Sequence, residues 1–143
     1  MRQTLKLAAV VAIIAATAAA AVADEPQVDF AKDIQPILKE SCLKCHSLDK
    51  KHHPKGAAEL RLDDPKLALK GGRSGPAIIP GDAKDSLLYK LLSGPVPRPD
   101  KNEDEKDIPP MPLAKRGQKF KPLPQDQIDL IRRWIDQGAK WSS

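Results

Sequence analysis

The amino-acid sequence predicts a small all-α domain in which short helices are joined by long loops. Three observations lead to this prediction. Apolar residues recur at helical spacing in several short segments, no segment alternates apolar and polar residues as a strand does, and 14 prolines and 8 glycines interrupt the chain. Aromatic residues are few, with 2 Trp, 1 Tyr and 2 Phe. A domain of this size buries only part of its surface, so a core this poor in large side chains favours a buried apolar cofactor.

The N-terminus has the pattern of a secretory signal peptide. Arg2 and Lys6 supply positive charge, an apolar run follows from Leu7 to Ala21, and Ala21-Val22-Ala23 is a small-residue cleavage site. We therefore expect a signal peptide over residues 1–23, a mature domain over residues 24–143, and a periplasmic or otherwise exported protein. The alternative is a retained N-terminal anchor helix, for which the run is somewhat short.

The first mature helix is predicted from a stripe of apolar residues. Phe30, Ile34, Ile37 and Leu38 fall at i, i+4, i+7 and i+8, the spacing of one helical face. Pro36 is tolerated only in the first turn, so we expect the helix to begin at an Asp33 N-cap and to end near residue 40. Residues 47–59 are basic and polar, and we expect a loop there.

Two short helices are predicted in the middle of the chain. Asp64 is an N-cap followed by a proline, and Gly71 ends the helix that they begin. A second helix is expected to begin at Asp82, to present its leucines to the core, and to end at Gly94.

The C-terminal part is predicted to be a proline-rich loop followed by one helix. Residues 95–112 hold six prolines and a charged cluster, which excludes a helix or a central strand. The last helix is expected over residues 125–137, ending at Gly138, with Trp134 packed against Phe30 and Ile34 of the first helix.

The segment Cys42-Leu43-Lys44-Cys45-His46 is the most informative motif of the chain. It reads C-x-x-C-H, the attachment signature of c-type haem, and these are the only two cysteines. The motif predicts one covalent haem c, with Cys42 and Cys45 bound to the porphyrin through thioethers and His46 as the proximal iron ligand. Attachment of haem c takes place outside the cytoplasm, in agreement with the predicted export.

The two cysteines have two alternative interpretations, a redox disulfide and a structural zinc site. A thioredoxin-type redox disulfide belongs to a βαβ pattern, which this sequence does not show. A structural zinc site needs four ligands, and only His46, His52 and His53 are available to join the two cysteines.

Met111 is predicted to be the distal iron ligand. It is the one methionine of the mature chain and lies between prolines, in Pro109-Pro110-Met111-Pro112, where a stiff backbone would hold a thioether in place. The alternative is a methionine that fills a gap or lies at the surface. His52 and His53 compete for the same position, but they follow His46 too closely to reach the opposite face of a haem.

The charge pattern gives weaker indications. Arg73 is a candidate contact for a haem propionate or an ordinary surface residue. The formal net charge of +5 includes the two cations of the signal peptide, and no aromatic residues are interleaved with the basic ones, so nucleic-acid binding is not indicated. Redox partner proteins are expected instead.

Several segments together resemble the planctomycete-type cytochrome c domain, a relative of the small class I cytochromes c. The matching segments are Val28-Asp29-Phe30, Asp33 to Leu38, Cys42 to His46, Leu60-Arg61-Leu62-Asp63, Gly72 to Ile78, Pro80-Gly81-Asp82, Ser86-Leu87-Leu88, Pro110-Met111-Pro112 and Trp134 to Trp141. The resemblance implies a mono-haem, all-helical domain with His and Met ligands, in which the first and last helices cross. An insert of about residues 95–107 before Met111 departs from the family pattern.

These observations predict an exported, monomeric electron carrier that is not an enzyme. Its expected act is a one-electron change at the iron, exchanged with redox partner proteins, and any membrane association is expected through partners or a retained signal anchor. The alternative function is a haem-based peroxidase or gas sensor with a labile sixth ligand.

Overall fold

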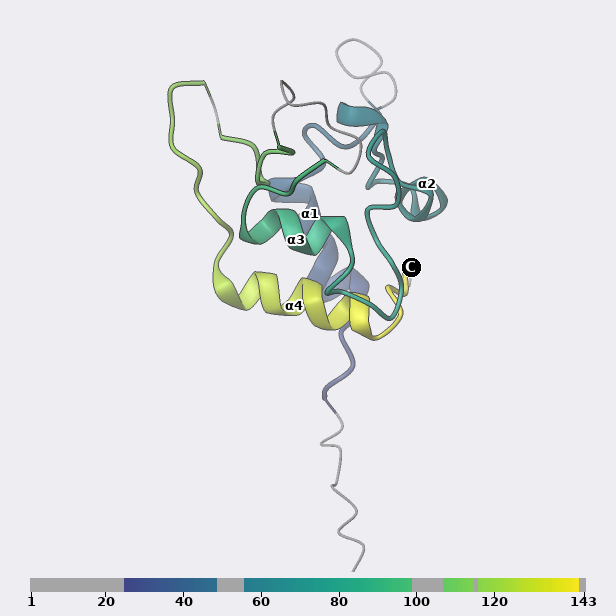
Figure 1. The fold of residues 1–143 in the computed structure, drawn as a ribbon. Helices are drawn as coiled ribbons and strands as arrows, with labels where there is room; N and C mark the ends of the chain where they lie inside the picture. Colours follow the sequence, from purple (N-terminus) through teal and green to yellow (C-terminus); the bar gives the residue numbers. More distant parts are fainter. Residues whose placement is uncertain (1–24, 49–55, 99–106, 115, 142–143) are drawn as a thin grey trace, which may run out of the picture.

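The fold is a small set of helices connected by long loops (Figure 1). The computed structural model describes residues 25–48, 56–98, 107–114 and 116–141. Six helical elements follow in the order η1 (Phe30–Ile34), α1 (Gln35–Ser41), η2 (Ala57–Glu59), α2 (Pro65–Lys70), α3 (Leu87–Ser93) and α4 (Gln125–Asp136). The described residues form no strand, only the isolated bridges Gly72–Gly75 and Val96–Ile108. The all-α prediction is therefore confirmed at the level of secondary structure.

The first helix begins earlier than the sequence predicted. A π-helical turn, η1, precedes α1, and its N-cap is Asp29 rather than Asp33. The Asp29 carboxylate accepts from the Lys32 backbone N–H at 2.9 Å, while the Asp33 carboxylate accepts from the Asp29 N–H at 2.9 Å. This reciprocal pairing satisfies two donors at the start of the helix, as a capping box does. η1 leads directly into α1, and Pro36 lies in the first turn of α1, where a proline is tolerated.

Of the two middle helices, α2 matches its prediction at both ends and α3 only at its C-terminal end. α2 begins after Asp64, whose carboxylate accepts from the Leu67 N–H at 3.0 Å, and ends at Gly71, as expected. α3 begins after Ser86 instead of at Asp82. Asp82 caps only a local turn through the Asp85 N–H, at 2.9 Å, and the adjacent Ala83 N–H is bound by Asp136 of α4 before the helix begins.

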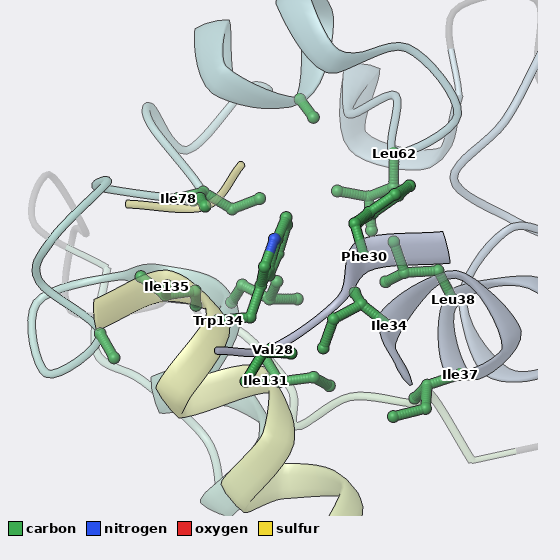
Figure 2. Packing of buried hydrophobic residues seen from close by; sticks show 14 of the residues in the cluster. Val28, Phe30, Ile34, Ile37, Leu38, Leu62, Ile78, Ile131, Trp134 and Ile135 are labelled. Carbon is green, nitrogen blue, oxygen red and sulfur yellow. The ribbon is translucent and has the colours of Figure 1, made fainter. Parts of the chain in front are cut away.

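The core lies where η1, α1 and α3 meet α4 (Figure 2). The predicted contact between the first and last helices is confirmed, with the rings of Phe30 and Trp134 5.7 Å apart. Trp141 completes an aromatic trio, 4.5 Å from Phe30 and 5.2 Å from Trp134. The indole N–H of Trp134 donates to the Lys140 carbonyl at 3.0 Å, so this buried donor is satisfied. Aromatic residues are thus concentrated at the crossing of the two ends of the domain.

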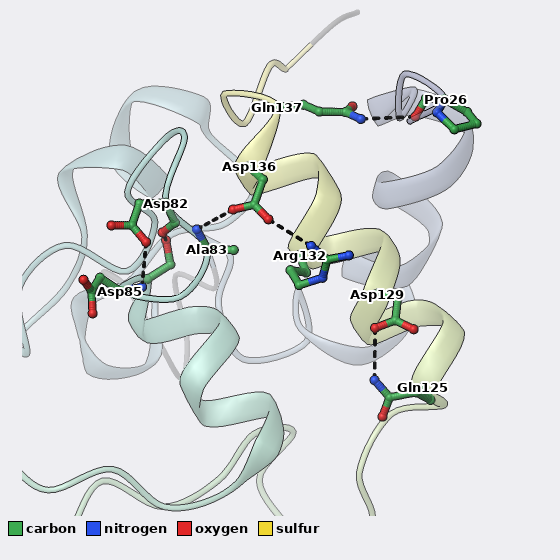
Figure 3. Close-up of polar contacts among 10 residues, drawn as sticks. Pro26, Asp82, Ala83, Asp85, Gln125, Asp129, Arg132, Asp136 and Gln137 are labelled. Carbon is green, nitrogen blue, oxygen red and sulfur yellow. Dashed lines mark hydrogen bonds and ion pairs between the residues drawn. The ribbon is translucent and has the colours of Figure 1, made fainter. Parts of the chain in front are cut away.

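Hydrogen bonds fasten the C-terminal end of α4 to the turn that leads into α3 (Figure 3). Asp136 accepts from the Ala83 N–H at 2.9 Å and also pairs with Arg132 at 3.2 Å. The Gly81 N–H donates to the Ile135 carbonyl at 2.8 Å, a carbonyl at the end of α4 that also accepts from the Gly138 N–H at 2.9 Å. The position of α3 is therefore set by α4. In the described part of the chain, no helix is both long and apolar enough to span a membrane.

Candidate functional site

The C-x-x-C-H motif forms a tight turn at the end of α1. The Cys42 N–H donates to the Leu38 carbonyl at 2.9 Å, and the N–H groups of Cys45 and His46 both donate to the Cys42 carbonyl, at 3.1 and 2.9 Å. The turn keeps helical hydrogen bonding from α1 into the motif. It holds the two sulfur-bearing residues and the imidazole on one short, rigid piece of backbone.

Both cysteines are free thiols in different surroundings. Cys42 is half-buried and packs against the edge of the core, whereas Cys45 is exposed. Burial, and to a smaller extent the nearby Cys45, raises the pKa of the Cys42 thiol to about 11. A reactive cysteine has a lowered pKa, so the surroundings of Cys42 do not favour the thiolate.

The segment 56–62 holds the motif from the other side. The Ala57 N–H donates to the Cys45 carbonyl at 2.8 Å, and the Leu62 N–H donates to the His46 carbonyl at 2.7 Å. Leu62 is itself buried in the core, so its hydrogen bond ties the backbone of His46 to the core. The Nδ1 atom of the His46 ring is buried. Two long-range backbone contacts therefore fix the residue predicted to bind iron.

An ion pair that the sequence analysis did not single out reinforces this segment. The Arg61 guanidinium binds both carboxylate oxygens of Asp63, with Nη2 to Oδ2 at 2.7 Å, and only 17% and 26% of the two side chains are exposed. The hydrogen bond from Arg61 lowers the pKa of Asp63. Asp63 Oδ2 also receives the Leu48 N–H at 3.4 Å, just after the motif. The sequence signal was present in Leu60-Arg61-Leu62-Asp63, but only as part of the family resemblance.

A glycine allows the next loop to close on segment 56–62. The Arg73 N–H donates to the Ala58 carbonyl at 2.8 Å, directly after Gly72. A Cβ atom on Gly72 would lie 2.6 Å from that same carbonyl oxygen and 3.0 Å from the Leu60 Cβ. Because real Cβ atoms do not approach backbone oxygens so closely, this position requires glycine.

Arg73, predicted as a propionate contact, lies at the surface. Its side chain is 71% exposed and pairs with Glu59 at 3.8 Å. Its backbone is fixed by Ala58, but its guanidinium has the exposure of an ordinary surface group, whose ion pair contributes little to stability. A propionate contact for Arg73 stays a prediction. His52 and His53 lie outside the described residues.

Met111 is attached to α3. Its N–H donates to the Leu91 carbonyl at 2.8 Å, and the residue is half-buried. Nearby, Val96, near the start of the insert of about residues 95–107, forms a bridge with Ile108, which follows the insert. His46 is thus held by α1 and segment 56–62, and Met111 by α3. The contacts described above do not join the two side chains, so ligation by Met111 stays a prediction.

Comparison with known proteins tests the family resemblance. Residues 42–99 match the family model of planctomycete cytochrome c. The matched segment runs from the first cysteine of the motif, through the Arg61–Asp63 pair and past the end of α3, and the resemblance inferred from the sequence is confirmed. The match supports a haem protein.

A curated relative is similar to this chain over most of its length. Hydrazine synthase subunit alpha of Kuenenia stuttgartiensis is 30% identical over 131 residues, which cover 81% of this chain. The chain spans only 16% of the length of that relative. No solved structure matches.

This relative corrects one prediction. The sequence analysis predicted an electron carrier that is not an enzyme, but the chain is similar to part of a protein named as a subunit of a synthase. The exclusion of an enzymatic role is therefore wrong. The exclusion rested on a motif that indicates which cofactor is attached and does not indicate whether the domain is part of an enzyme.

Proposed function

We propose that this chain is an exported cytochrome c domain that holds one covalent haem and passes single electrons in the service of a redox enzyme. The observation that carries the proposal is the turn from Cys42 to His46, which presents two free thiols and an imidazole on one backbone unit held from two sides. This donor set fits haem c. When bound, haem c supplies a reversible one-electron couple at its iron.

The residues of the chain have separate roles in this proposal. Cys42 and Cys45 would anchor the porphyrin as thioethers, and His46 and Met111 would bind the iron. The thioether of Met111 would favour a higher potential than a second histidine. Residues 56–63 hold His46 still, and a ligand that does not move between redox states suits fast electron transfer.

The assignment to a redox enzyme is drawn from the similarity to hydrazine synthase subunit alpha. Since the chain corresponds to a small part of that protein, the similarity supports a module role and does not carry over its substrates. The predicted signal peptide, over residues outside the described ones, supports work outside the cytoplasm.

Visible spectra of the exported protein test this proposal. We expect a sharp reduced α-band near ~550 nm, haem that resists acid-acetone extraction, and a weak ferric sulfur-to-iron band that is lost in Met111→Ala. Haem that extracts would refute covalent attachment. A sulfur-to-iron band that survives Met111→Ala would refute the distal ligand while leaving the covalent haem in place.

A second candidate function is a catalytic haem with a labile sixth ligand. The alignment with a synthase subunit favours it, because an enzyme can use the open iron position for chemistry. A high-spin ferric spectrum together with ready binding of CO to the ferrous protein would support this function. A low-spin ferric spectrum and slow CO binding would support electron transfer.

A further inference from the structure

The loop that carries Met111 and the insert that precedes it share one anchor at the end of α3. The Met111 N–H donates to the Leu91 carbonyl at 2.8 Å. Val96 and Ile108 exchange both of their backbone hydrogen bonds, at 3.0 and 2.8 Å. Leu91 and Ile108 are each only 7% exposed, so the anchor is attached to the buried part of the domain.

The Leu91 carbonyl accepts from Met111 for a reason that is visible in the sequence. In a continuing helix this carbonyl would accept from the N–H four residues later, which belongs to residue 95. Residue 95 is a proline and has no N–H. The carbonyl is therefore open at the helix end, and a distant donor, the Met111 N–H, occupies it.

The Val96–Ile108 bridge fixes the distance between the two ends of the insert. Two residues that exchange both hydrogen bonds have Cα atoms about 5.5 Å apart, whatever path the chain takes between them. The chain leaves α3, passes Val96, and returns at Ile108, three residues before Met111. The end points of the insert are thus fixed relative to α3, and so is the start of the methionine segment.

We propose that the Leu91 carbonyl and the Val96–Ile108 bridge form a backbone clamp that positions Met111. The inference rests on the proposed function, in which Met111 is the distal ligand. Val96 and Ile108 are positioning residues in this account, because they act on the iron only through the backbone of Met111. The clamp predicts that a change in the length of the insert leaves the haem ligands unaltered.

A pair of substitutions at one position tests the clamp in the full, haem-loaded protein. Val96→Pro and Val96→Ala both remove the branched valine side chain, but only proline removes the N–H that donates to the Ile108 carbonyl. We expect Val96→Pro to speed hydrogen exchange at the Met111 amide by about fivefold relative to Val96→Ala, the effect of one net backbone hydrogen bond. The ferric sulfur-to-iron band should weaken in Val96→Pro and be kept in Val96→Ala. Equal exchange rates and equal bands in the two variants would overturn the clamp.

A shortened insert gives an independent test. Replacing residues 98–106 with an Asn-Gly dipeptide leaves a four-residue connection between Val96 and Ile108, a common hairpin length. We expect the sulfur-to-iron band, the reduction potential and the protection of the Met111 amide to stay as in the parent protein. Loss of the band would overturn the proposal, since the insert itself would then position the methionine. If Val96→Pro fails to fold, the variant with the shortened insert tests the clamp by itself.

Met111→Ala, measured in parallel, distinguishes failure of the clamp from failure of the proposed distal ligand. If it abolishes the band while Val96→Pro and Val96→Ala behave alike, the clamp fails and the proposed ligand stands. If the band persists in Met111→Ala, the distal ligand of the proposed function fails, and the role of the clamp at the iron fails with it.

Discussion

The buried hydroxyl of Ser86 is predicted to hold together the turn on which α3 and α4 meet. Ser86 is 0% exposed. Its Oγ accepts from the Ile79 N–H at 2.8 Å and donates to the Asp82 carbonyl at 2.7 Å. The same turn donates to α4 through Gly81 and Ala83, so a change at Ser86 acts on the joint that places α3.

The expected cost of Ser86→Ala follows from these contacts. The Asp82 carbonyl keeps a partner, because the Ser86 backbone N–H also donates to it at 3.2 Å. The Ile79 N–H loses its acceptor, and an unsatisfied, partly buried donor costs about 1–3 kcal/mol. Loss of one oxygen leaves little empty volume, so the cavity term is small. We expect a decrease of about 2 kcal/mol in the free energy of unfolding.

Guanidinium unfolding of the haem-loaded protein measures this change. The midpoint should fall at an unchanged slope, because the surface exposed on unfolding stays the same. Ser93→Ala is the matched control, since Ser93 is the exposed last residue of α3 and should change stability by less than about 0.5 kcal/mol. Equal midpoints for Ser86→Ala and the parent protein would refute the reasoning.

Two further predictions concern the loops that hold His46. Gly72→Ala should lower the free energy of unfolding by about 1–3 kcal/mol, because its Cβ would lie 2.6 Å from the Ala58 oxygen. Gly94→Ala is the control, because a Cβ at Gly94 would meet open space and the backbone there is extended. The denaturant midpoint should therefore fall less in Gly94→Ala than in Gly72→Ala. Similar losses in the two variants would contradict the steric account. Asp63→Asn should destabilise the protein at neutral pH, because Arg61 lowers the pKa of Asp63. A carboxyl with a lowered pKa in the folded state contributes stability above its ordinary pKa of 3.8 and loses it as the pH falls through the lowered value. The difference between Asp63→Asn and the parent should therefore shrink below pH 3.8, and a difference independent of pH would exclude the ion pair as its source.

Local signals in the sequence were enough for the helices whose boundaries depend on neighbouring residues. α2 and α4 begin and end within one residue of their predicted bounds, because a cap, a proline and a glycine act over one turn. η1 and α3 were misplaced at their starts. Asp29 and Asp33 cap each other across a π turn, and the chain before α3 is held by α4, which no local pattern shows.

The sequence by itself determined the chemistry of the domain. Two thiols and an imidazole at C-x-x-C-H spacing lie close together along the backbone, so their use in holding haem c could be inferred without a fold, and the family match supports a haem protein. Only the tertiary structure decided how the motif is held, through Ala57, Leu62 and the Arg61–Asp63 pair, and how Met111 is tied to Leu91 across the insert. These contacts join residues that are separated along the chain. Their partners are set by the packing of α1, α3 and α4, and spacing within a short segment carries no information about them.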